Sequence, residues 1–256
     1  MPATGESPEY VQNILESLRA KKRTYSSGED VIDSLGSTSL AIPIGPFGAL
    51  KNKTIQEVIR ISDEEDLDIH TITPSYTRAR TPDDHPQSRT AEDGVTFAEL
   101  NDAEINGNLV SFDVIGDDIE ATYRSSFYGR YNIGSTSTHS TLQLMGAGFY
   151  DCDVMLMVTS GEALEHRLRA LRSTRPDFIP KAIDGLELLD FAKQNVQYQW
   201  FNAVEILPTL DGPTKAARKV INIILHKTNE ILTEERTLQY IDDMDAALKR
   251  VLRDVH

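Results

Sequence analysis

A glycine loop with a lysine close behind it is the stretch of this sequence best suited to chemistry. The apolar run 40–44 leads into Gly45, Gly48 and Lys51, and the residues after Lys51 place apolar side chains three and four positions apart. This order predicts a strand, a turn and a helix. Such a connection can hold a phosphate, because backbone N–H groups and the helix N-terminus converge on the anion. Gly45, Gly48, Lys51 and Asn52 are therefore candidate phosphate ligands.

The loop departs at two positions from the full phosphate-loop pattern G-x-x-x-x-G-K-[ST]. Gly45 and Lys51 have the required separation, but Leu50 stands at the second glycine and Asn52 at the hydroxyl residue. Asn52 would offer Mg²⁺ a neutral oxygen, whereas Thr54 lies too far along unless the loop is shifted. The alternative is an ordinary turn followed by a helix that begins with a solvated lysine.

A second group of residues could bind phosphate further along the chain. Ser75, Arg78 and Arg80 lie in a segment rich in hydroxyl residues. Arginine binds phosphate through forked, charge-assisted hydrogen bonds. The alternative is a polar loop in which serine and threonine side chains cap turns.

Composition limits the classes of partner. The 256 residues carry a formal charge of −14, with 39% hydrophobic and 26% charged residues. This acidity repels nucleic acid and anionic membranes, so neither is an expected partner. The single cysteine, Cys152, and the lack of a signal-like or membrane-spanning apolar segment lead us to expect a cytoplasmic protein.

The pattern along the chain predicts an α/β fold, namely a three-layer phosphate-loop core with a parallel sheet and a small β-rich insert. Period-two alternation in 109–115 and 119–124, around Gly116, predicts a hairpin inside that insert. We expect a helical extension at 1–38, a core domain at 39–226 with the insert at about 74–131, and a C-terminal helix at 227–256. Further core strands are expected at 69–72, 141–145, 153–158 and 201–207, with a loop at 132–140.

Helices are predicted at 8–22, 161–172, 183–197, 214–226 and 234–255. The first and last carry apolar stripes that could cover the domain or join a protein partner or second copy. In 161–172 the leucines are expected to face inward and the charged residues, Arg167 and Arg172 among them, to face largely outward.

In the order of its motifs, the chain resembles the guanylate kinase family of phosphate-loop nucleoside-monophosphate kinases. Gly45-Pro-Phe-Gly48 is similar to that family's Gly-Pro-Ser-Gly loop, and Ser75-Tyr-Thr-Arg78-Ala-Arg80 to its monophosphate-binding segment. Asp93-Gly-Val-Thr-Phe97 and Phe127-Tyr128-Gly129 resemble the start and end of its insert. The segment 154–172 resembles its late strand and arginine-bearing lid. The resemblance covers about residues 39–226.

The resemblance implies phosphoryl transfer from ATP, with Mg²⁺, to a nucleoside monophosphate, GMP in that family. It places Lys51 at the β- and γ-phosphates and makes Arg172 and Arg175 candidate catalytic lid residues. Ser75, Arg78, Arg80, Glu120 and Tyr128 would bind the monophosphate. The spacing leaves open whether Ser111 or Glu120 reads the base.

The departures from the family support a second hypothesis. Leu50 and Asn52 alter the loop, and Gln143 stands where the family has an acidic residue. The chain could therefore be a catalytically inactive guanylate-kinase-like module that binds a nucleotide or a protein.

Overall fold

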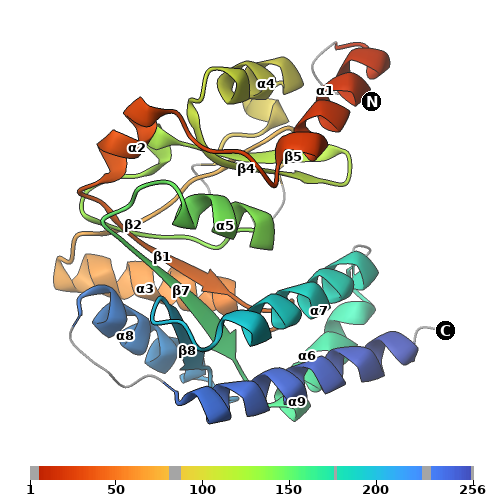
Figure 1. Cartoon of the computed structure of the whole chain (residues 1–256). Coiled ribbons are helices and arrows are strands. Elements are labelled where there is room, and N and C mark those ends of the chain that lie inside the picture. Colours follow the sequence, from red (N-terminus) through yellow and green to blue (C-terminus); the bar gives the residue numbers. More distant parts are fainter. Residues whose placement is uncertain (1–5, 81–87, 176–177, 227–231, 255–256) are drawn as a thin grey trace. The chain divides into compact units, whose positions relative to one another are not determined.

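The computed structural model describes residues 6–80, 88–175, 178–226 and 232–254 (Figure 1). The chain forms two compact units. Unit 1 consists of Met1–Leu40 and Ile69–Cys152, and unit 2 consists of Ala41–Asp68 and Asp153–His256.

The strands form two sheets. One sheet has five strands in the order β2-β6-β1-β7-β8, and the other has three strands in the order β3-β5-β4. The pairs β2–β6 and β7–β8 are parallel, whereas β5 is antiparallel to both β3 and β4. The predicted α/β class with a parallel sheet and a small β-rich part is thus confirmed. The strands are β1 Ser39–Ile44, β2 Ile69–Thr71, β3 Ser75–Tyr76, β4 Leu109–Ile115, β5 Asp118–Tyr123, β6 Tyr131–Ile133, β7 Asp151–Val158 and β8 Phe201–Glu205.

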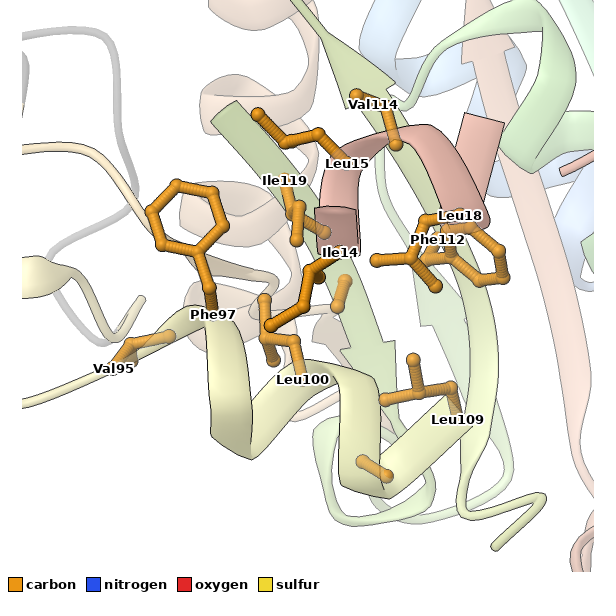
Figure 2. Close-up of a cluster of buried hydrophobic side chains, with 12 residues drawn as sticks. Ile14, Leu15, Leu18, Val95, Phe97, Leu100, Leu109, Phe112, Val114 and Ile119 are labelled. Atoms are coloured by element: carbon orange, nitrogen blue, oxygen red, sulfur yellow. The ribbon is translucent and has the colours of Figure 1, made fainter. Parts of the chain in front are cut away.

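In unit 1 the predicted hairpin is present as β4 and β5, joined through Gly116 and Asp117. Gly116 has a φ of 60°, a left-handed conformation that glycine adopts readily in tight hairpin turns. Helices α1 (Pro8–Lys21) and α4 (Phe97–Ile105) pack on one face of this hairpin (Figure 2). Their contact buries twelve hydrophobic residues, among them the fully buried Phe112. The N-terminal apolar stripe is therefore covered within its own unit.

Helix α5 (Thr138–Met145) contacts β4. The strand predicted at 141–145 was wrong, because α5 occupies these residues. The loop predicted at 132–140 is shorter than expected: it comprises 134–137, between β6 and α5. Ser137 caps α5, because its hydroxyl accepts a hydrogen bond from the Ser140 N–H at 3.1 Å. The strand beside β2 is instead the short β6. Gln143 joins α5 to β4 and to Lys22: its side chain accepts a hydrogen bond from the Phe112 N–H at 2.7 Å and donates one to the Lys22 carbonyl at 2.7 Å.

Unit 2 surrounds its strands with helices. Figure 1 shows α3 (Lys51–Glu65) beside α8 (Gly212–Ile224), with α6 (Gly161–Arg172) and α7 (Phe178–Asn195) beside α9 (Glu234–Arg253). The apolar stripe of α9 is buried at Ile241, Met244, Leu248 and Val251. No helix in the described part of the chain has both the length and the apolar character needed to cross a membrane.

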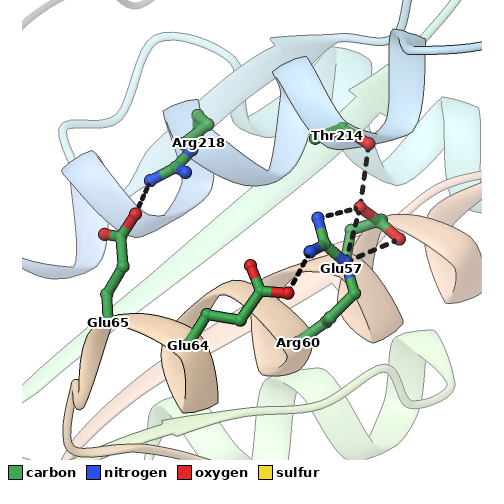
Figure 3. Close-up of polar contacts among 6 residues, drawn as sticks. All are labelled: Glu57, Arg60, Glu64, Glu65, Thr214 and Arg218. Atoms are coloured by element: carbon green, nitrogen blue, oxygen red, sulfur yellow. Dashed lines mark hydrogen bonds and ion pairs between the residues drawn. The ribbon is translucent and has the colours of Figure 1, made fainter.

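Polar contacts fix α3 against α8 (Figure 3). A carboxylate oxygen of Glu57 accepts from Arg60 Nη2 at 2.9 Å and from Thr214 Oγ1 at 2.8 Å. These two hydrogen bonds lower the pKa of Glu57, with Arg60 contributing most. Arg218 of α8 also pairs with Glu65 at the last turn of α3. These contacts hold the middle and the last turn of α3 against α8.

Candidate functional site

The connection between β1 and α3 begins with a tight turn. The Ala49 N–H donates to the Pro46 carbonyl at 3.0 Å, and Gly48, at the third position of the turn, has a φ of 88°. A type II turn requires a positive φ there, which favours glycine. Gly45 is favoured for another reason: a Cβ at that position would lie 3.2 Å from the Met157 carbonyl oxygen of β7, which is a tight contact. The geometry therefore explains both glycines that the sequence singled out.

Leu50 has an unusual backbone conformation for the residue before a helix. Its φ of 63° and ψ of 18° are left-handed, and no side chain caps α3 there. By contrast, α1, α4, α5, α6 and α9 each begin after an extended Ser or Thr whose side chain accepts a backbone hydrogen bond. The left-handed conformation costs a non-glycine residue about 1–2 kcal/mol. The chain thus keeps a glycine-like backbone at the very position where the phosphate-loop pattern has its second glycine.

This strain leads to a prediction about stability. We expect Leu50→Gly to leave the free energy of unfolding unchanged or to raise it by up to ~1 kcal/mol. Relief of the strain outweighs or matches the extra chain entropy of glycine, about 0.5–1 kcal/mol, and the loss of a half-buried side chain. Chemical denaturation followed by circular dichroism measures the change.

Gln56→Gly is the matched control for that prediction. Gln56 is exposed in the interior of the same helix, where glycine costs about 0.5–1 kcal/mol. The two variants should therefore differ in direction. Equal losses of stability would contradict a strained Leu50.

The first turn of α3 carries the candidate phosphate and metal ligands. Lys51 is half-buried and Asn52 is exposed. Thr54, considered as a metal ligand in a shifted loop, is fully buried and donates through Oγ1 to the Leu50 carbonyl at 3.3 Å. No group of three or more His, Cys, Asp or Glu side chains in the described residues could hold a metal ion. Of the residues considered as Mg²⁺ ligands, exposed Asn52 has a side-chain oxygen that could reach an ion carried by a nucleotide, whereas the Thr54 hydroxyl is turned to the Leu50 carbonyl.

The aromatic ring of Phe47, in the same turn, contacts two cationic side chains. The guanidinium of Arg175 lies 5.6 Å and the ammonium of Lys181 lies 5.4 Å from the ring centroid, both within cation–π range. Arg175 therefore lies beside Phe47 of the loop. Arg172 is exposed in the last turn of α6, and no hydrogen bond or ion pair joins it to another described residue.

Arg167 contacts the loop directly, and the sequence did not single it out. Its Nη1 donates to the Gly48 carbonyl at 3.1 Å. It was expected to face largely outward, and that expectation was wrong. The helical pattern gave no signal for this contact, because the acceptor is a backbone carbonyl more than a hundred residues away in sequence.

In unit 1, both predicted phosphate-binding arginines have partners inside the protein. The Arg78 guanidinium lies 4.2 Å from the centroid of the Tyr76 ring. Arg80 Nη2 donates to the Ser88 carbonyl at 2.6 Å and to Asp93 at 2.9 Å. Asp93 also accepts from the Thr90 backbone, and the Thr90 hydrogen bonds, followed by Arg80, keep its pKa below its usual value.

The β3-β5-β4 sheet separates the remaining candidates. Tyr76 pairs with Glu120, so the two share a face, whereas Ser75 pairs with Ala121 on the other face. Ser75 is buried, and the structure does not bring its side chain together with Glu120. Glu120 is half-buried and accepts from Thr136 Oγ1 at 3.1 Å.

Ser111, the alternative base-reading residue, is buried on β4, and its hydroxyl has no hydrogen-bond partner. The same holds for the Ser140 hydroxyl of α5. Asp113, which the sequence did not single out, is buried opposite Glu120 and accepts from Lys22 Nζ at 3.2 Å. Tyr128 is more than half exposed, with its ring centroid 6.5 Å from that of His70. Ser111, Asp113 and Glu120 therefore lie on the same face of the sheet.

The fold is of the α/β class, and its β1–α3 connection has the order of strand, turn and helix expected of a phosphate loop. No family model matches the sequence, and no curated protein matches it. Among solved structures, the chain is similar to the guanylate kinase from Anaplasma phagocytophilum, with a TM-score of 0.47 and 13% sequence identity. The match covers 80% of this chain and 96% of that chain.

Proposed function

We propose that the β1–α3 loop binds the phosphates of ATP and that the chain is a nucleotide-kinase-like phosphotransferase. The conformation of Leu50 carries the proposal. A non-glycine residue held left-handed at a helix start is strained, and such strain is concentrated at functional sites. It also leaves the first N–H groups of α3 without a side-chain cap, which suits an anion.

On this proposal, catalysis is a matter of positioning and charge neutralisation. Lys51 binds the β- and γ-phosphates beside the N–H groups of the loop. Arg175, near Phe47, is the candidate to neutralise charge on the transferred group, with Arg172 available from α6. Mg²⁺, when bound with ATP, would neutralise phosphate charge, with Asn52 near it.

The proposed acceptor is a nucleoside monophosphate, with GMP suggested by the sequence resemblance. Arg78, Arg80 and Tyr128 are the candidates for its phosphate, and Ser75 is retained with them. For the base, half-buried Glu120 and buried Ser111 are both retained. Glu120 offers a carboxylate, and Ser111 offers a hydroxyl with no protein partner.

An assay of ADP release tests the enzyme directly. Mg-ATP is supplied with each common nucleoside monophosphate in turn, and then with small sugar phosphates. Turnover that depends on one acceptor supports the proposal. The absence of turnover at micromolar enzyme with every acceptor would remove it.

A second candidate is a catalytically inactive module that binds nucleotide or protein. The ion pair between Arg80 and Asp93 favours it, because an arginine already paired gains less by binding phosphate. Asn52, in place of a hydroxyl residue, points the same way. Calorimetric binding of GMP or ATP without turnover would identify this module, whereas turnover would exclude it.

A further inference from the structure

Arg167 makes three hydrogen bonds in a fixed fork. Its Nε donates to the Ala163 carbonyl at 3.0 Å, its Nη1 to the Gly48 carbonyl at 3.1 Å and its Nη2 to Thr159 Oγ1 at 2.9 Å. These acceptors belong to α6, to the turn after β1 and to the residue after β7. One side chain therefore ties the candidate phosphate loop to two other elements of unit 2.

All three acceptors are neutral. No carboxylate in the described residues pairs with Arg167, whereas Arg169, two positions along α6, pairs with Glu165 at 2.9 Å and Asp254 at 2.7 Å. Arg167 is half-buried, and its desolvation lowers the pKa of the guanidinium. Keeping a partly desolvated cation without a counterion is costly. An anion bound at the loop would supply the missing negative charge.

The bond to Gly48 also fixes the orientation of the Gly48–Ala49 peptide unit. A peptide unit is planar and trans, so its C=O and N–H point in opposite directions. Fixing the Gly48 carbonyl toward Arg167 therefore fixes the Ala49 N–H toward Pro46, where it closes the turn. The orientation of this peptide in turn sets the direction in which the chain enters Leu50 and α3.

We propose that Arg167 is the positioning residue of the phosphate loop, turning the Gly48 carbonyl away from the bound phosphate and holding the turn in its binding conformation. This inference rests on the proposed function. Arg167 acts through the Gly48–Ala49 peptide, and its role needs the geometry of guanidinium in addition to its charge.

The test compares Arg167→Met, Arg167→Lys and the control Arg169→Met with the wild-type chain. ATP affinity is measured by calorimetry, thermal unfolding gives Tm, and hydrogen exchange of the Ala49 amide is measured without ligand. We expect Arg167→Met to weaken ATP binding at least tenfold and to speed Ala49 exchange at least tenfold. Arg167→Lys should still bind ATP at least fivefold more weakly than wild type, because one ammonium cannot span all three acceptors. Arg169→Met should match wild type in ATP affinity and in Ala49 exchange.

The outcomes separate the inference from the proposed function. If Arg167→Met keeps wild-type ATP affinity, the positioning role is overturned while ATP binding stands. Full rescue by Arg167→Lys would also overturn it, because charge alone would then suffice. If the wild-type chain fails to bind ATP, the proposed function fails. In that case the exchange rate of the Ala49 amide still tests whether Arg167 holds the turn. An unchanged rate in Arg167→Met would overturn this role, and a faster rate would support it. If Arg167→Met does not fold, the ATP affinity and the Ala49 exchange rate of Arg167→Lys test the positioning role instead.

Discussion

Replacing Lys51 with methionine is expected to weaken ATP binding roughly 10- to 100-fold while leaving Tm almost unchanged. Methionine removes the charge and keeps most of the apolar stem. Losing one hydrogen bond to a charged group costs about 1.5–3 kcal/mol, and each ~1.4 kcal/mol is a tenfold change in affinity. Stability should hardly respond, because a partly exposed lysine at the first position of α3 adds little to it. Calorimetric titration of ATP into both proteins measures the effect.

Lys53→Met is the matched control, since Lys53 is exposed two positions further along the same helix. Its replacement should change ATP affinity less than threefold. If Lys53→Met proves the more damaging change, the register of the loop is two residues further along and Thr54 becomes the metal ligand. The burial of Thr54 and its bond to the Leu50 carbonyl argue against that register. Equal ATP affinity in wild type and Lys51→Met would mean that the loop does not bind phosphate through Lys51.

The elements predicted best are those whose side chains repeat with a clear period over enough residues. The hairpin of β4 and β5 alternates over most of its length and turns at Gly116, so its strands could be placed from sequence to within one residue. Thr141–Met145 is only five residues long, and its apolar residues at every second position are typical of a strand. A short helix with one exposed leucine gives the same pattern. Leu142 is that exposed residue, and the cap at Ser137 decided the outcome in favour of a helix.

Some features of the candidate site could likewise be predicted from sequence, and others could not. Gly45 and Gly48 could be found from sequence because a close approach favours glycine at the first position and a turn with a positive φ favours it at the second. The strain at Leu50 could not, since leucine carries no signal for a left-handed backbone. The contact of Arg167 with Gly48 joins a side chain to a carbonyl, and backbone acceptors are the same at every residue. Such contacts become visible only when the fold has brought the two segments together.

Phe112→Ala is expected to lower the free energy of unfolding by about 3–5 kcal/mol, which is the usual cost of removing a buried phenylalanine side chain. Phe112 is fully buried among residues of α1, α4 and the hairpin (Figure 2). Its ring centroid lies 5.0 Å from that of Tyr25 in an edge-on contact, which adds to the loss. Urea unfolding measured by far-ultraviolet circular dichroism reports on the whole chain, and the fluorescence of Trp200, the single tryptophan, reports on unit 2.

Ile115→Ala is the control for that loss, because Ile115 ends the same strand with 49% of its surface exposed. Its cost should stay within about 0.5 kcal/mol, as for most surface substitutions. A loss below ~1 kcal/mol in Phe112→Ala would contradict the packing of α1 and α4 on the hairpin.

Phe112 alternates along β4 with Ser111 and Asp113, which face the opposite side of the sheet. In the folded fraction, Phe112→Ala should therefore bind GMP within threefold of wild type, whereas a change at Ser111 or Glu120 that affects base reading should weaken GMP binding without a comparable loss of stability.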